Sequence, residues 1–332
     1  MKMNIRLNIR IIVQILSITF FCNVTFATES KTEFITKTAI KGNPKSVEQT
    51  YYKAVNLTKT LTEEDVEYAF FSKITKEGYI MENIRYGSRK NLLEKTTFSY
   101  NENHNLINVS SYDSAENILF QRIYIYNKKE QLIEREDISK DNSIYEREIY
   151  KYINNVTYIY FYDSDGKLKY YNTHEKDSIK KEDILYLSDG KPISKKQYEY
   201  DDNGKLVRYR SYYIPENNLQ EDVIYKYDDI GNLLEIFLPL DFQIPNRRIT
   251  YKYDDRGYLY EYAYSNYDAD YKFTYSYNDH GNLTEELCYK NEILDNRTIY
   301  KYDLNDNWIE KTVYEEDNLM KVTKRKIEYY EM

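Results

Sequence analysis

The feature that most constrains this chain is a short motif repeated in tandem. Its unit reads Tyr-x-Tyr-Asp/Asn-x-x-Gly-Asn/Lys-Leu. The clear copies run from Tyr160 to Leu168, Tyr198 to Leu206, Tyr225 to Leu233, Tyr251 to Leu259 and Tyr275 to Leu283, and less regular ones from Phe98 to Leu106, Tyr124 to Leu132 and Tyr300 to Trp308. The second tyrosines lie 24 to 27 residues apart, except for two spacings of 36 and 38. Such a period is typical of a repeat architecture in which each unit packs on its neighbours.

Each copy of the motif predicts a β-hairpin. Two tyrosines at alternate positions of a strand lie on one face, and the Asp that follows suits the first position of a type I turn. The glycine suits the left-handed residue of a three-residue loop with a bulge. The predicted structural glycines are Gly166, Gly204, Gly231, Gly257 and Gly281. The same position holds His104, Glu130 and Asp306 in the irregular copies, where we expect strain of roughly 1 kcal/mol.

The turn also predicts the register of each hairpin. Tyr227 should face Leu233, Tyr253 should face Leu259, and Tyr302 should face Trp308. A looser second turn is expected between copies, because about 25 residues hold two strands and two turns. The predicted fold is therefore all-β: tandem antiparallel hairpins form one continuous, curved meander sheet, with a half-barrel as a further option.

The N-terminus has the layout of a secretory signal peptide. Three cations precede an apolar run, and Ala27 marks the expected cleavage point. We therefore expect three parts: a signal peptide at 1–27, degenerate β repeats at 28–95, and the main repeat domain at 96–332. The mature protein is expected to have no integral membrane span and to be secreted, periplasmic or on the cell surface.

Composition narrows the classes of partner. The net charge of −8 would become −11 after cleavage, because Lys2, Arg6 and Arg10 are lost. An acidic chain is a poor ligand for nucleic acid, whose binding depends on lysine and arginine contacts to phosphates. The chain holds 41 tyrosines against 12 phenylalanines and one tryptophan, so tyrosine rings must supply much of any core. Cys288, the one cysteine beyond the signal peptide, is expected to be a half-buried strand residue.

The tandem Tyr-Asp-x-x-Gly-Asn-Leu motif resembles the YD repeat, also called the RHS repeat. The resemblance covers Phe98 to about Tyr330, and the chain resembles short, secreted bacterial members of unknown role. Long members of that family form a hollow shell around a toxin, and others are wall-associated or proposed to bind carbohydrate. Their Asp-Pro-x-Gly signature before a toxin domain is absent here. The resemblance therefore implies a repeat architecture of β-hairpins. The absence of the signature disfavours a protein that delivers a toxin.

The sequence contains no catalytic pattern that we can identify. His104, His174 and His280 lack metal-ligand spacing, and no nucleophile or phosphate-binding motif occurs. Acidic turns such as Asp163-Ser-Asp165-Gly166 supply too few oxygens for a strong Ca²⁺ site, and the hairpin turn explains them, although weak calcium binding is the alternative. We therefore expect no enzyme activity, no metal and no cofactor.

The tyrosine rows are the best candidates for a binding surface. The predicted binding residues are Trp308, Tyr302, Tyr277, Tyr253 and Tyr227, with a structural core as the competing interpretation. The leading hypothesis is a non-catalytic extracytoplasmic protein that binds a cell-envelope glycan or an envelope protein. The alternatives are a structural protein that self-associates through its edge strands, and an immunity-type partner of a secreted toxin.

Overall fold

The computed structural model describes residues 39–53, 61–175, 180–239, 246–267, 269–315 and 318–331. The predicted signal peptide lies outside the described residues. One antiparallel sheet of 22 strands accounts for almost all of this part of the chain. Its strands are β1 (Pro44–Tyr52), β2 (Val66–Ile74), β3 (Ile80–Tyr86), β4 (Leu92–Tyr100), β5 (Leu106–Asp113), β6 (Ile118–Tyr126), β7 (Leu132–Ser139), β8 (Ile144–Ile153), β9 (Val156–Asp163), β10 (Leu168–Glu175), β11 (Lys180–Leu187), β12 (Pro192–Tyr200), β13 (Leu206–Tyr213), β14 (Asn218–Tyr227), β15 (Leu233–Leu238), β16 (Arg247–Tyr253), β17 (Leu259–Ser265), β18 (Asp270–Tyr277), β19 (Leu283–Lys290), β20 (Ile293–Tyr302), β21 (Trp308–Glu315) and β22 (Asn318–Tyr329). Three 3-10 helices lie between strands: η1 (Glu63–Asp65), η2 (Ser88–Lys90) and η3 (Ile214–Glu216).

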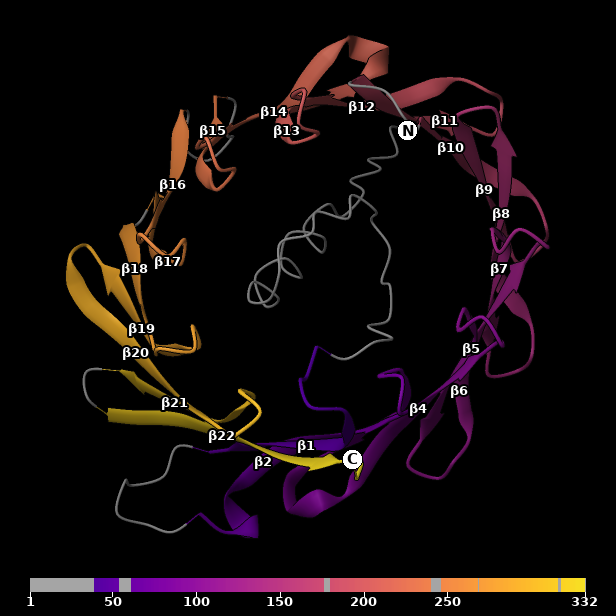
Figure 1. Ribbon diagram of the computed structural model, residues 1–332. Coiled ribbons are helices and arrows are strands. Elements are labelled where there is room, and N and C mark those ends of the chain that lie inside the picture. The colour runs from indigo at the N-terminus through magenta and orange to yellow at the C-terminus, as the bar shows by residue number, and fades with distance from the viewer. Residues whose placement is uncertain are drawn as a thin grey trace, which may run out of the picture. The chain divides into compact units, whose positions relative to one another are not determined.

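The sheet is a meander that closes on itself. Each strand pairs with its neighbours in sequence, and β1 pairs with both β2 and β22 (Figure 1). The all-β meander is confirmed, and closure replaces the predicted half-barrel. No described strand has an unpaired edge, so the edge-strand self-association expected from the sequence has no free edge to use in this part of the chain. Within the predicted N-terminal part, 28–95, the described strands β1, β2 and β3 and the start of β4 belong to the same sheet as the repeats.

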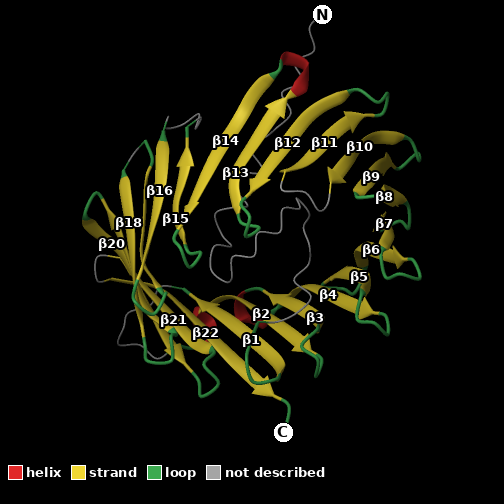
Figure 2. Ribbon diagram, turned by 45° about the horizontal axis from the view of Figure 1, so that its top comes forward, coloured by secondary structure: helices red, strands yellow, loops and turns green. Residues whose placement is uncertain are grey.

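The register of the hairpins follows the motif. Tyr227 pairs with Leu233, Tyr253 with Leu259, and Tyr302 with Trp308, as predicted. A bulge precedes each of these pairs, because the left-handed residue of the turn adds one residue to the second strand. The hairpin turns lie at the ends of the strands (Figure 2).

The two faces of the sheet differ in chemistry. We call one the tyrosine face: it carries Tyr251, Tyr253, Tyr262 and the residues that alternate and pair with them round the sheet. The other is the charged face, which carries Lys252, Glu261 and their counterparts. Round the whole sheet, residues of the tyrosine face pair with residues of the tyrosine face, and this also holds where β22 pairs with β1. Both faces are therefore continuous across the closure.

The second tyrosine of the motif stabilises the sheet through its hydroxyl. In six of the eight copies this hydroxyl donates a hydrogen bond to a backbone carbonyl at the start of a strand in the preceding hairpin, and Tyr152 of β8, which lies outside the copies, makes the same bond; the distances are 2.6 to 3.0 Å. The pairs are Tyr100–Ile80, Tyr126–Leu106, Tyr152–Leu132, Tyr227–Leu206, Tyr253–Leu233, Tyr277–Leu259 and Tyr302–Leu283. Each bond ties one hairpin to the one before it. A desolvated phenol is stabilised by such a partner, and a phenylalanine at these positions could not make the bond.

The two long spacings between copies shift the phase of the repeat. Normal copies are two strands apart, so their turns lie at the same end of the sheet. The copy at Tyr160–Leu168 lies three strands after the preceding copy and three before the next, so its turn at 163–167 lies at the opposite end. The hydroxyl ladder is interrupted here: among the described residues, neither Tyr162 nor Tyr200 donates such a bond.

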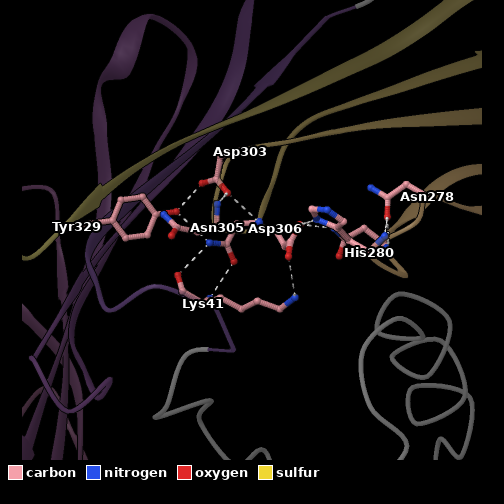
Figure 3. A network of polar contacts seen from close by, with 9 residues as sticks. Lys41, Asn278, His280, Asp303, Asn305, Asp306 and Tyr329 are labelled. Carbon is pink, nitrogen blue, oxygen red and sulfur yellow. Dashed lines mark hydrogen bonds and ion pairs between the residues drawn. The ribbon is translucent and has the colours of Figure 1, made fainter.

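A polar clasp holds the segment around Lys41 against the turn between β20 and β21 (Figure 3). The Asn307 side chain accepts a hydrogen bond from the Lys41 backbone N–H at 2.8 Å and donates to the Lys41 carbonyl at 2.9 Å. Asn307 also donates to the Tyr329 hydroxyl, which donates to Asp303. Asn307 is 6% exposed. The clasp therefore lies directly beside the strand pair, β1 and β22, that closes the sheet.

Candidate binding surface

The predicted binding tyrosines lie on the tyrosine face. The hydroxyls of Tyr227, Tyr253, Tyr277 and Tyr302 are the ladder donors described above. Burial raises the pKa of Tyr277 to about 12, because ionisation of the phenol is unfavourable in a desolvated site. Each of the four tyrosines thus occupies the same position of its own repeat and makes the same type of hydrogen bond there. They lie on different strands and do not form a single shared site.

Trp308 lies opposite Tyr302, and a cation covers its ring. The Arg325 guanidinium lies 3.4 Å from the centroid of the Trp308 ring. Arginine stacks well on aromatic faces. Trp308 therefore contacts a cation of its own chain on one face of the indole.

The turn glycines adopt the conformation that the motif requires. Gly166, Gly204, Gly231, Gly257 and Gly281 have φ values of 73°, 78°, 99°, 82° and 79°. The residues that replace glycine, His104, Glu130 and Asp306, have φ values of 63°, 60° and 59°. L-residues in this region are strained.

The side chains that replace glycine make contacts with the preceding turn. Glu130 accepts hydrogen bonds from Asn103 and Asn105. Asp306 accepts a hydrogen bond from Asn282 at 2.7 Å and contacts His280 Nδ1 at 2.9 Å (Figure 3). These contacts offset part of the backbone strain, and the sequence alone did not predict them.

The acidic turns use their carboxylates for backbone hydrogen bonds. Asp163 Oδ1 accepts the N–H groups of Asp165 and Lys167, and Asp254 Oδ1 accepts those of Arg256 and Tyr258. Within the described residues, no group of three His, Cys, Asp or Glu side chains is placed to hold a metal ion. The hairpin geometry thus accounts for the aspartates that had suggested weak calcium binding.

The histidines and the cysteine do not form a shared site. His174 Nδ1 contacts Asp183 on the tyrosine face, whereas His280 contacts Asp306 on a turn. Cys288 is 8% exposed, and burial raises the pKa of its thiol to about 11. A buried thiol with a raised pKa is a poor nucleophile.

An ionic network on the tyrosine face was not anticipated from the sequence. Arg122 forms a bidentate pair with Asp137, with both N···O distances at 2.6 Å. Arg135 lies 3.0 Å from Glu148 and 3.6 Å from Asp137. The Asp137 and Glu148 side chains are 3% and 2% exposed, so these charges are buried. Only the pairing of β6, β7 and β8 brings the four residues together.

The charged face carries cross-strand ion pairs along much of the sheet. Examples are Lys252–Glu261 at 2.7 Å and Arg297–Glu285 at 2.6 Å. These side chains are solvated, with Lys252 55% exposed. Exposed pairs contribute little to stability but give the face a mixed, hydrated surface.

The shifted copy of the repeat places tyrosines on this charged face. Because β9 runs one strand out of phase, Tyr160 points away from the tyrosine face and pairs with Tyr171, which pairs with Tyr186. The ring centroids are 5.4 Å apart for Tyr160–Tyr171 and 4.6 Å apart for Tyr171–Tyr186, with interplanar angles of 26° and 4°. Tyr158 stacks beside Tyr160 at 6.4 Å. We call Tyr158, Tyr160, Tyr171 and Tyr186 the tyrosine column.

The tyrosine column is half-buried and borders a cation. The Lys151 ammonium lies 4.9 Å from the centroid of the Tyr160 ring. Behind the column, Phe161 and Tyr170 stack on the tyrosine face at 4.5 Å. The sheet is therefore aromatic on both faces at this point. Phe161 and Tyr170 already pack on the tyrosine face, so the column on the charged face is not part of that packing. The sequence signal for it was the pair of long spacings on either side of the Tyr160–Leu168 copy.

No protein-family model and no curated protein matches the chain. Among solved structures, TcdB2-TccC3 matches at 12% identity and a TM-score of 0.35, over 85% of this chain and 20% of that one. A porin-like protein from Bacteroides uniformis matches at 9% identity and a TM-score of 0.31, over 87% and 98%. A protein of unknown function from Bacteroides fragilis matches at 13% identity and a TM-score of 0.27, over 31% and 91%.

This chain spans about a fifth or less of the TcdB2-TccC3 chains that it matches. Likenesses of this strength assign the chain to no family, and the resemblance to YD repeats stays a prediction. In the described residues, no helix is long and apolar enough to cross a membrane.

Proposed function

We propose that this protein is an exported, non-catalytic binding protein whose ligand is a cell-envelope glycan, held on the tyrosine column. The observation that carries the proposal is the stacking of Tyr160, Tyr171 and Tyr186 on the charged face. Tyrosine combines an apolar ring with a hydroxyl that hydrogen-bonds. Sugar rings offer the matching groups, C–H faces and hydroxyl edges.

The surroundings of the column support a neutral or weakly charged ligand. The turns at 163–167 and 187–191 border the column and carry Asp, Ser and Lys side chains. These groups can donate and accept hydrogen bonds at the rim of an aromatic contact. The acidic net charge of −8 disfavours nucleic acid, which would otherwise compete for an aromatic platform.

The test is binding of the purified protein to an array of envelope polysaccharides, with three variants. Tyr171→Ala removes the central ring of the column and should abolish binding. Tyr264→Ala is the matched control, because Tyr264 stacks on Tyr271 at 5.2 Å on the tyrosine face, and it should retain binding. Trp308→Ala tests the site predicted from the sequence and should also retain binding.

Two results would count against the proposal. Loss of binding in Trp308→Ala but not in Tyr171→Ala would move the site to the residues predicted from the sequence. Absence of saturable binding to any polysaccharide would rule out a glycan ligand and turn the search to envelope proteins, for which exposed tyrosines are common anchors.

A further inference from the structure

Stacked tyrosine pairs recur in this sheet, and they differ in what lies over their rings. The stacked pairs among the described residues are Tyr51–Tyr68, Tyr158–Tyr160, Tyr160–Tyr171, Tyr171–Tyr186, Tyr258–Tyr277 and Tyr264–Tyr271. In five of these six pairs, a lysine or an arginine lies 4.9 to 5.9 Å from the centroid of one ring or of both. The exception is Tyr171–Tyr186: within the described part of the chain, no cation lies over either ring.

Tyr171 and Tyr186 are also the most parallel of the stacked pairs. Their ring planes differ by 4°, whereas those of the other five pairs differ by 15° to 26°. The two residues lie opposite each other on β10 and β11, half-buried on the charged face, so their hydroxyl ends lie together. Desolvation raises the pKa of Tyr171, and the nearby phenol of Tyr186 raises it further. The ring carbons beside the two hydroxyls therefore face one another across the stack.

The absence of a cation matters for oxidation of these rings. A phenol that loses an electron and its proton becomes a radical, whose unpaired electron is shared between the oxygen and the carbons beside the hydroxyl. A cation over a ring opposes the loss of an electron, because it repels the positive charge that is left. Lys151 lies 4.9 Å from the centroid of Tyr160, and Tyr158 has Tyr160 as its stacked partner. Coupling of two oxidised rings in the tyrosine column is therefore most favourable between Tyr171 and Tyr186.

Two side chains that are usually oxidised before tyrosine are shielded in this fold. The Arg325 guanidinium lies 3.4 Å from the centroid of the Trp308 ring, and its charge opposes oxidation of the indole. Cys288 is 8% exposed, and burial raises the pKa of its thiol to about 11, which keeps the reactive thiolate scarce. We therefore expect neither residue to compete strongly with the tyrosine column for an oxidant.

We propose that one-electron oxidation by a peroxidase and hydrogen peroxide joins Tyr171 to Tyr186 as dityrosine. A C–C bond forms between the carbons beside the two hydroxyls, and one C–H bond breaks in each ring. Hydrogen peroxide takes up the two electrons and the two protons and leaves as two molecules of water. The product ties β10 to β11 covalently. The reaction uses the column without any ligand, so it does not depend on the proposed glycan function.

The experiment treats the full chain, at low protein concentration, with a peroxidase and limiting hydrogen peroxide. We expect dityrosine fluorescence, and protease digestion with mass spectrometry should find one main linked product, between the peptides that hold Tyr171 and Tyr186. Its mass should equal the sum of the two peptides less two hydrogen atoms. The oxidised protein should also unfold at a higher urea concentration, because a covalent link restricts the unfolded chain.

Three variants test the residue assignment, each with its fold checked by circular dichroism. Tyr186→Phe keeps a ring in the stack but removes the phenol, and it should lose most of the dityrosine. Tyr271→Phe is the matched control: Tyr271 stacks on Tyr264 at 5.2 Å and 16°, but Arg247 lies 5.3 Å from the Tyr264 centroid, so the yield should not change. Lys151→Met removes the cation over Tyr160 and should increase the share of a Tyr160–Tyr171 product.

Any of three results would contradict the proposal. Linked Tyr264–Tyr271 in a yield equal to that of Tyr171–Tyr186 would show that cations over the rings do not direct the coupling. An unchanged dityrosine yield in Tyr186→Phe would place the reaction elsewhere. Products that join two chains, in excess of the internal link even at the lowest protein concentration, would assign the reaction to exposed rings such as Tyr267, which is 71% exposed.

Discussion

The two faces of this sheet use the same residue types for different purposes. On the tyrosine face, rings are desolvated, and hydroxyls such as that of Tyr253 donate to backbone carbonyls within the sheet. On the charged face, the rings of Tyr160 and Tyr171 stack outside that ladder. Ion pairs divide the same way: Arg135 and Glu148 are buried on the first face, whereas Arg297 and Glu285 are solvated on the second.

This comparison shows that the face, and not the residue type, decides what a side chain does here. The face is set by the phase of the repeat, since a shift of one residue or one strand exchanges the two sides.

The buried ionic network should be far more sensitive to mutation than the ion pairs of the charged face. Arg135→Met leaves the buried Asp137 and Glu148 without one of their cations and should cost about 3–5 kcal/mol of unfolding free energy. Arg297→Met is the matched control, since Arg297 is 46% exposed, and it should cost about 1 kcal/mol or less. Denaturant titration measures both, and similar costs for the two variants would contradict the distinction between the faces.

The hydroxyl ladder predicts a smaller difference between two conservative substitutions. Tyr253→Phe removes the hydrogen bond to the Leu233 carbonyl and should cost about 1 kcal/mol, because a buried acceptor loses its donor. Tyr160→Phe, on the column, should leave the unfolding free energy within about 0.5 kcal/mol. Chemical denaturation of the two variants side by side provides the measurement. An equal loss for both would mean that the ladder contributes nothing specific.

The smallest effect concerns stability at alkaline pH. Burial raises the pKa of Tyr262 to about 12, above the usual value near 10, so the folded state favours the protonated phenol. That contribution is complete below pH 10 and is lost as the pH rises towards 12. Tyr262→Phe removes one such group and should move the midpoint of alkaline unfolding, followed by circular dichroism, to a slightly higher pH.

The control for the alkaline experiment is Tyr260→Phe, at a residue that is 42% exposed, and the midpoint should not move. A fall in the midpoint for Tyr262→Phe would show that the phenol is not favoured in its protonated form in the folded protein.

Much of the local structure could be predicted from the sequence. The pairs Tyr227–Leu233 and Tyr302–Trp308, and the left-handed residue of each turn, follow from interactions within about ten residues. The candidate site was less predictable. The sequence directed attention to Trp308 and the regular tyrosines. The tyrosine column arises because the Tyr160–Leu168 copy lies three strands, and not two, from its neighbours. The number of intervening strands, and so the face on which its tyrosines lie, is known only from the structure.

The sequence by itself determined the hairpins, their register and the meander, because a turn and its flanking strands are neighbours in the chain and need little chain entropy to close. Only the tertiary structure decided the closure of β1 on β22, between segments such as Gln49 and Arg325 that are 276 residues apart. The clasp at Asn307 and the buried network around Arg135 also depend on partners from different hairpins. A local motif cannot specify such contacts, since they form only when the curvature of all the hairpins together brings distant strands side by side.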